Sequence, residues 1–143
     1  MQLPRIVQGE NDVLVSEDGR RHIDLFTAHG TAWLGHGNRT IADAIAGQLG
    51  RVWITGGLET AAGSEARMRV EEWFPASHRL AGLCSTGMEA AEFAIRIARV
   101  ATGKCGVIGF QNSMHGKSLA TACLGWDNKD GVTLPAFHRL PFL

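Results

Sequence analysis

The sequence predicts an α/β fold, and three features of its second half carry this prediction. Helical and strand patterns alternate from residue 59 onward, which is typical of a layered α/β domain. The helical patterns cover residues 61–74 and 85–99, and the strand patterns cover residues 80–84 and 107–110. The strand at 80–84 leads through a glycine turn directly into a helix, as in parallel α/β units.

The first half of the chain predicts smaller elements. Residues 13–15 and 21–25 form a predicted hairpin, because an Asp-Gly pair between them is a strong turn signal. A glycine-rich loop is expected over 29–38. Thr40 and Asp43 have the spacing of a helix cap, so we expect a helix to begin there and run to residue 49.

The segment 85–99 is the most informative part of the chain. Thr86 and Glu89 have the spacing of a capping box, which marks the beginning of a helix. Gly87, between them, lets a ligand approach the backbone closely. A strand, a tight turn and a helix N-terminus together form a common anion site, since free N–H groups and the helix dipole favour negative charge. A capped structural helix without a ligand is the alternative.

The helix in this segment carries one polar stripe and is otherwise apolar. Glu89, Glu92, Arg96 and Arg99 recur at intervals of three or four residues, and alanine, isoleucine, phenylalanine and methionine occupy most of the remaining surface. Such a helix is expected to pack between other elements. Gly103 follows the last turn and predicts its end.

Composition excludes several classes of function. The 143 residues are 45% hydrophobic and carry no net charge, so electrostatics favour neither nucleic acid nor an anionic membrane surface. We find no span-length apolar stretch and no signal-peptide core. Cys84, Cys105 and Cys123 are odd in number and widely spaced, which favours reduced, packed thiols and a cytoplasmic protein.

Three sequence blocks resemble one enzyme family. The first is DGRRHIDL at 18–25 followed by LGHGN at 34–38, the second is TGMEAAE at 86–92, and the third is FQNSMHGK at 110–117. In this order they resemble the N-terminal part of class III aminotransferases, which are pyridoxal-phosphate enzymes of fold type I. The resemblance implies an incomplete fold type I architecture. Residues 1–58 would form the N-terminal segment, and residues 59–143 the first part of the large cofactor-binding α/β domain with its parallel sheet.

The resemblance also implies a cofactor site. The backbone N–H groups of Gly87 and Met88 would hold the phosphate of pyridoxal 5′-phosphate, with the Thr86 hydroxyl nearby. Met114 stands where the family has an aromatic residue that lies on the pyridine ring, and His115 follows it. His115 could instead be a hydrogen-bonded polar residue at a strand end.

Two residues depart from the family pattern, and two more would line the substrate pocket. Met88 replaces a serine or threonine, so one hydroxyl donor to the phosphate is lost while the backbone donor remains. Met114 offers the cofactor ring less contact area than an aromatic side chain. Ala28 and His29 fall in the segment that lines the substrate pocket of the family.

The family also needs a lysine that forms a Schiff base with the cofactor and an aspartate at its pyridinium nitrogen. The lysines here are Lys104, Lys117 and Lys129, and none has that lysine's context; Lys117 is the leading surrogate. We therefore expect no catalytic residue on this chain and no activity alone. A second chain would supply the lysine for amino-group transfer between an amine or amino acid and a 2-oxo acid.

Other interpretations of the sequence remain open. A few strands of a parallel sheet leave open edges and apolar surface, which predicts a partner chain and an oligomer. The same resemblance also fits a truncated inactive remnant or a non-catalytic binding or scaffolding module. His22, His29 and His36 recur every seven residues, but the glycines between them argue against a helix that would align them for a metal, and we expect no metal site.

Overall fold

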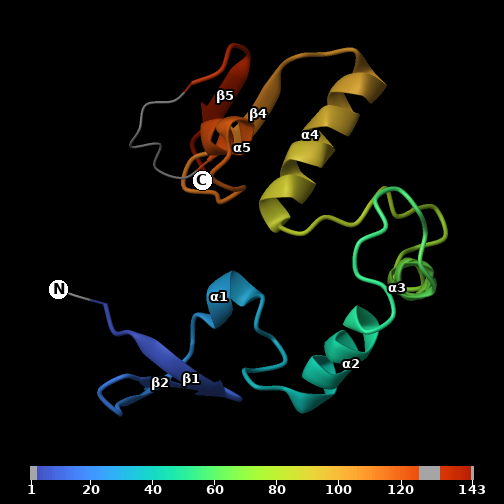
Figure 1. Ribbon diagram of the computed structural model, residues 1–143. Helices are drawn as coiled ribbons and strands as arrows, with labels where there is room; N and C mark the ends of the chain where they lie inside the picture. The colour runs from blue at the N-terminus through green and yellow to red at the C-terminus, as the bar shows by residue number, and fades with distance from the viewer. Residues whose placement is uncertain (1–2, 126–132, 143) are drawn as a thin grey trace. The chain divides into compact units, whose positions relative to one another are not determined.

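The computed structural model describes residues 3–125 and 133–142. The chain divides into two compact units, Met1–Ala66 and Arg67–Leu143, and we describe each by itself (Figure 1). Lys129 and its polar turn lie outside the described residues. The boundary that we expect after residue 58 stays a prediction.

The first unit contains a three-stranded antiparallel sheet in the order β1-β2-β3. These strands are β1 (Ile6–Glu10), β2 (Val13–Ser16) and β3 (Arg21–Ile23). The predicted hairpin is therefore confirmed, and Gly19 in its turn has a φ of +80°, which glycine adopts without a steric cost. Strand β1 was not predicted from the sequence; it pairs with β2 through a register irregularity between Ile6 and Gln8.

Three helices follow: α1 (Thr27–Gly30), α2 (Arg39–Leu49) and α3 (Ala61–Glu71). The expected cap at Thr40 is wrong, because the side chain of Asn38 accepts the N–H of Ile41 at 3.2 Å. Asparagine is among the preferred capping residues, and it starts the helix two residues before Thr40. Helix α3 also ends before the expected residue 74, in a turn that precedes Pro75.

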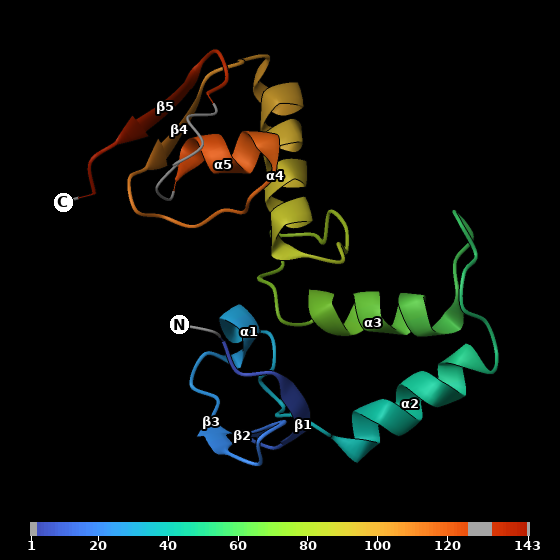
Figure 2. The same ribbon diagram turned by 60° about the vertical axis from the view of Figure 1, so that its left-hand side comes forward.

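The second unit holds α4 (Gly87–Thr102), β4 (Val107–Phe110), α5 (Leu119–Leu124) and β5 (Phe137–Leu140). Strands β4 and β5 pair in parallel, with Val107 opposite Phe137. Helix α5 packs against both strands and against α4, as both ribbon views show (Figure 1, Figure 2). The predicted helix at 85–99 and the predicted strand at 107–110 are confirmed. The sequence from residue 119 is compatible with a helix or a turn, and it forms a helix, whereas β5 was not predicted.

Residues 80–84, predicted as a buried strand, form no strand here. Leu83 is 55% exposed, and the N–H of Leu80 donates to a side chain, Glu71 Oε1, at 3.1 Å. A strand exists only when a neighbouring strand accepts its ladder bonds, and no described segment pairs with these residues. The prediction of a buried strand at 80–84 is therefore wrong for this chain.

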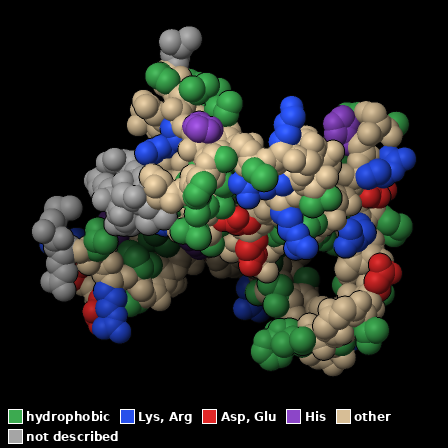
Figure 3. Space-filling model, turned by 90° about the horizontal axis from the view of Figure 1, so that it is seen from above, with side chains coloured by type: hydrophobic (Ala, Val, Ile, Leu, Met, Phe, Trp, Pro, Cys, Tyr) green, Lys and Arg blue, Asp and Glu red, His purple; other side chains and the backbone are tan. Residues whose placement is uncertain are grey.

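Helix α4 and strand β4 are also less buried than the sequence predicts. No residue of α4 is buried, and Ile108 and Phe110 of β4 are exposed. The chain exposes 11919 Å² of surface. A compact protein of 143 residues exposes about 7,200 Å², and two separate compact halves about 8,700 Å². Hydrophobic side chains accordingly appear across the surface drawn in Figure 3.

Candidate functional site

The N-terminus of α4 provides an anion cup. Thr86 Oγ1 accepts the N–H of Glu89 at 3.1 Å, and Glu89 Oε2 accepts the N–H of Thr86 at 3.0 Å, so the predicted capping box is present. The N–H groups of Gly87 and Met88 belong to the first helical turn, which has no intrahelical acceptors. The hydroxyl of Thr86 accepts one bond and can still donate another. This arrangement can bind a phosphate.

The segment after β4 carries Met114 and His115. The hydroxyl of Ser113 donates to the carbonyl of Phe110 at 2.5 Å. Its oxygen lies 2.9 Å from Nε2 of His115, which therefore donates to it. Met114 is 43% exposed and is available for contact with a ligand.

The structure brings the second and third sequence blocks together through Met88. Its sulfur accepts the N–H of Lys117 at 3.4 Å. A Cβ on Gly116 would lie 2.6 Å from Cγ of Met88 and 2.7 Å from Oγ1 of Thr121, so only glycine allows this approach. The methionine that replaces the family's hydroxyl residue thus links the anion cup to the segment that carries Met114.

Glu92 joins the same two segments one helical turn later. Its Oε1 accepts the N–H groups of Ala120 at 3.2 Å and Thr121 at 3.3 Å, and it also accepts the hydroxyl of Ser118. The carboxylate therefore caps α5 from α4. From the sequence, Glu92 was predicted only as part of a polar stripe, because its partners lie more than 25 residues away.

Ala28 and His29, the predicted substrate-side residues, lie in α1 of the first unit. Thr27, Ala28 and His29 have φ values of +48°, +49° and +60°, so this turn is left-handed. Left-handed backbone costs about 1–2 kcal/mol for each residue that has a Cβ. Strain of this kind is concentrated at functional sites, which supports the interpretation of α1 as part of a site.

Asp24 holds the beginning of this strained turn. Its Oδ1 accepts the N–H groups of Phe26 at 3.1 Å and Thr27 at 2.8 Å, and its Oδ2 lies 2.7 Å from Nε2 of His36. The hydrogen bond from His36 and then the backbone bond from Thr27 lower the pKa of the Asp24 carboxyl. Asp24, Thr27 and His36 line a cleft of about 290 Å³ beside Trp33.

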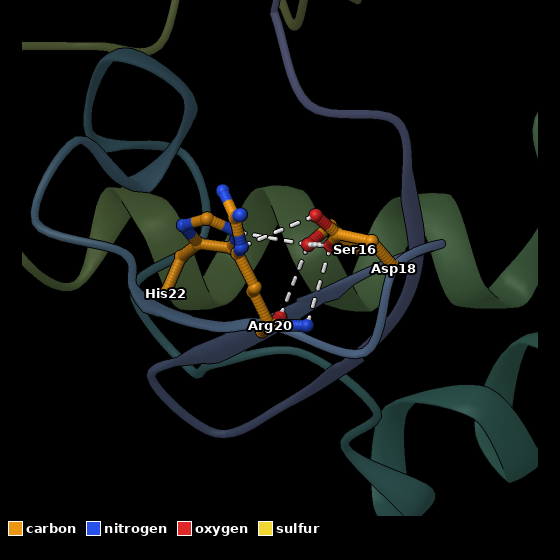
Figure 4. Close-up of polar contacts among 4 residues, drawn as sticks. All are labelled: Ser16, Asp18, Arg20 and His22. Atoms are coloured by element: carbon orange, nitrogen blue, oxygen red, sulfur yellow. Dashed lines mark hydrogen bonds and ion pairs between the residues drawn. The ribbon is translucent and has the colours of Figure 1, made fainter.

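Ser16, Asp18 and His22 meet in the hairpin of the first unit, but they do not form a catalytic triad (Figure 4). The hydroxyl of Ser16 donates to Asp18 Oδ1 at 2.6 Å, and its oxygen lies 2.9 Å from Nε2 of His22. In a triad the histidine stands between serine and aspartate, whereas here the buried serine stands between the other two. The hydrogen bond from Ser16, followed by the backbone N–H of Arg20, lowers the pKa of Asp18.

Three further expectations concern metals, thiols and membranes. Among residues 3–125 and 133–142, no three His, Cys, Asp or Glu side chains are arranged to hold a metal ion. Cys84 and Cys105 are exposed and Cys123 is buried, so the expected packing role applies to Cys123. No helix in the described part of the chain has the length and apolar character needed to cross a bilayer.

The second unit combines a pair of parallel strands with a capped helix N-terminus, an arrangement that often binds anionic groups of ligands, and sequence comparison gives the family. The model of the family "Aminotransferase class-III" matches residues 2–142. The chain belongs to this family, whose cofactor is pyridoxal phosphate. The expected membership and the incomplete fold type I architecture are therefore confirmed.

The chain matches curated aminotransferases over only part of their length. The chain is 36% identical to the 2-aminoadipate transaminase of Pseudomonas putida over 135 residues, which are 92% of this chain and 31% of that protein. It is 28% identical to the acetylornithine aminotransferase of Listeria monocytogenes over 141 residues, which are 96% of this chain and 36% of that protein. The chain thus spans about a third of the length of the curated relatives it matches.

Solved structures show the same fold. The taurine:2-oxoglutarate aminotransferase of Bifidobacterium kashiwanohense, in complex with PLP and glutamate, aligns with a TM-score of 0.88 at 22% identity. The alignment covers 100% of this chain and 34% of that one. A transaminase from Virgibacillus aligns with a TM-score of 0.91 at 17% identity, over 99% of this chain and 35% of that one.

The residues present fit one end of the family cofactor. A Cβ on Gly87 would meet nothing within 4 Å, so the beginning of α4 is not crowded at this residue. The Glu89 carboxylate near this space is folded back on the N–H of Thr86, which partly offsets its charge. Neither Lys104 nor Lys117 lies in a setting that resembles the family's Schiff-base lysine.

Proposed function

We propose that this chain is the N-terminal portion or subunit of a pyridoxal-phosphate-dependent aminotransferase. It supplies the phosphate cup and the Met114 side of the cofactor site, and a second chain supplies the Schiff-base lysine. The bound cofactor supplies an electron sink for moving an amino group between an amine or amino acid and a 2-oxo acid. The observation that carries this proposal is the contact between Met88 and Lys117, which joins the phosphate block to the block that carries Met114.

Each predicted site residue has a distinct task in this proposal. The N–H groups of Gly87 and Met88 and the hydroxyl of Thr86 bind the phosphate oxygens. Met114 packs against the ring, and His115, held by Ser113, lies beside it. Ala28 and His29 line the substrate side, on a backbone whose strain is fixed by Asp24. These roles are proposals for Thr86, Gly87, Met88, Met114, His115, Ala28 and His29.

The native mass of the protein purified from its source tests this proposal. We expect a mass that equals this chain plus a larger second chain, and bound cofactor on a lysine of that second chain. A mass of this chain alone or of its homo-oligomer, with no bound cofactor, would contradict the proposal. The same result would favour the alternative functions, a truncated inactive remnant or a non-catalytic binding or scaffolding module.

A reconstitution experiment separates these alternatives further. The full chain is mixed with its copurified partner and pyridoxal phosphate, and amino transfer to a 2-oxo acid is measured. Activity that requires both chains supports the split enzyme. Stable binding of the partner without cofactor uptake would instead indicate a scaffolding module.

A further inference from the structure

One face of α4 holds the segment that follows β4 at two points. Met88 and Glu92 are four residues apart and therefore lie on the same face of the helix. Met88 accepts the N–H of Lys117, while Glu92 accepts the N–H groups of Ala120 and Thr121. We call this pair of residues, Met88 and Glu92, the α4 clasp.

Of the two residues in the α4 clasp, Glu92 makes the stronger hydrogen bonds. An ionised carboxylate that accepts several donors makes hydrogen bonds roughly twice as strong as neutral ones. The first-turn N–H groups of α5 need acceptors, and negative charge is favourable at that end of a helix. Glu92 is half-buried, and its bond to the hydroxyl of Ser118 adds a third contact at the start of α5. By contrast, the Met88 sulfur is a weak acceptor.

The clasp fixes one end of the segment that carries the predicted ring contacts. Residues 113–117 lie between the end of β4 at Phe110 and the start of α5 at Leu119. Their first end is fixed because Phe110 lies in the ladder with Leu140 and its carbonyl accepts the hydroxyl of Ser113. Their second end is fixed to α4 through Ser118 and Glu92. Met114, in the middle, is exposed and so has little packing of its own to hold it.

We infer that Glu92 is a positioning residue for the cofactor site. By capping α5 from α4, it sets Met114 and His115 at a fixed place relative to the phosphate cup, so that one ligand can meet both. Glu92 itself does not touch the cofactor. This inference rests on the proposed function and adds to it a residue that couples recognition of the ring to recognition of the phosphate.

Ligands with and without a ring test this inference. In the full chain, with its partner where one copurifies, Glu92→Ala is compared with Glu92→Gln and with Glu72→Ala. Glu72→Ala makes the same change at an exposed residue of the same unit. Affinities are measured for pyridoxal phosphate by its absorbance and for inorganic phosphate by calorimetry. We expect Glu92→Ala to lower the affinity for pyridoxal phosphate about tenfold, because the ring contacts are then misplaced. The affinity for inorganic phosphate should fall by less than about twofold.

Comparing the affinities for the two ligands distinguishes a positioning role of Glu92 from a general effect on stability. If Glu92→Ala weakens both ligands equally, the residue serves only the stability of α4, and the inference is overturned. If it weakens neither, Met114 and His115 do not depend on Glu92, which also overturns it. We expect Glu92→Gln, which keeps an acceptor oxygen, to retain most of the affinity, and Glu72→Ala to leave both affinities unchanged.

Hydrogen exchange gives a readout that needs no ligand. We expect Glu92→Ala to speed exchange at the amides of Ala120 and Thr121, and we expect the control Glu72→Ala to leave exchange at these amides unchanged. Unchanged exchange at these amides in Glu92→Ala would contradict the cap itself. Failure of wild-type protein to bind pyridoxal phosphate, with or without the partner, would refute the proposed function, whereas equal effects on the two ligands would refute only the positioning role.

Discussion

Gly116 is a position where adding one methyl group should damage the site. Its φ is +136°, a backbone conformation that residues with a Cβ rarely adopt. A Cβ there would lie 2.6 Å from Cγ of Met88, 2.7 Å from Oγ1 of Thr121 and 2.9 Å from Cβ of Met88. Gly116→Ala therefore meets two separate obstacles, one in the backbone and one in the packing.

The two obstacles have estimable costs. A residue held in a region that only glycine favours costs about 1–3 kcal/mol. Overpacking by one methyl group costs about 1–3 kcal/mol, and the flexible Met88 side chain places this site near the lower limit. We expect Gly116→Ala to lower the free energy of unfolding by about 3 kcal/mol. Adding Met88→Ala removes the closest atom and should restore about 1 kcal/mol of this loss.

Urea unfolding of the full chain, followed by circular dichroism, measures these changes. Gly47→Ala is the matched control, because Gly47 lies inside α2 and a Cβ there would meet nothing within 4 Å. This control should raise stability by about 1 kcal/mol, since alanine is the better helix former. A Gly116→Ala variant within about 0.5 kcal/mol of wild type would refute the steric reasoning, because changes of that size are ordinary for surface sites.

Three further changes have defined expectations. Thr86→Ala removes the capping acceptor and should cost about 1 kcal/mol of stability by urea unfolding, together with weaker binding of inorganic phosphate. Asp24 has a lowered pKa through His36, so its stabilising contribution is present above about pH 4 and is lost as the pH falls through the lowered value. When the pH is lowered from neutral to acidic, the thermal unfolding midpoint should therefore fall less in Asp24→Asn than in wild type. In Gly109→Ala the new Cβ would overlap the backbone of Leu124, so this change should detach α5. Hydrogen exchange should then show a loss of amide protection in that helix.

Local sequence signals predicted the beginning and end of α4. Thr86 and Glu89 form the capping box within four residues, and Gly103 ends the helix with a φ of +67°. The same kind of signal gave a wrong prediction at α2, where Thr40 and Asn38 are both good caps and only the structure shows that Asn38 is used. Local chemistry thus identifies helices more reliably than it chooses between neighbouring caps.

Contacts between residues that are far apart along the chain could not be predicted from the sequence. The partners of Glu92 are 26 to 29 residues away, and nothing near Glu92 in the sequence indicates them. For residues 80–84 the apolar pattern was clear, but a strand also needs a neighbouring strand, which is not among the described elements. The resemblance to the family named the candidate residues, and the structure added that Met88 brings two of their blocks into contact.

The exposed surface indicates what kind of partner the proposed function requires. The 11919 Å² exceed the surface of two separate compact halves by about 3,200 Å². Covering this excess would bury a similar area on the covering protein, which gives a total above the range of about 2,000–5,000 Å² for many obligate interfaces. A transient regulator would leave most of the excess exposed. We therefore expect the proposed partner to be a permanent one, and removing it should cause aggregation of this chain rather than release a stable monomer.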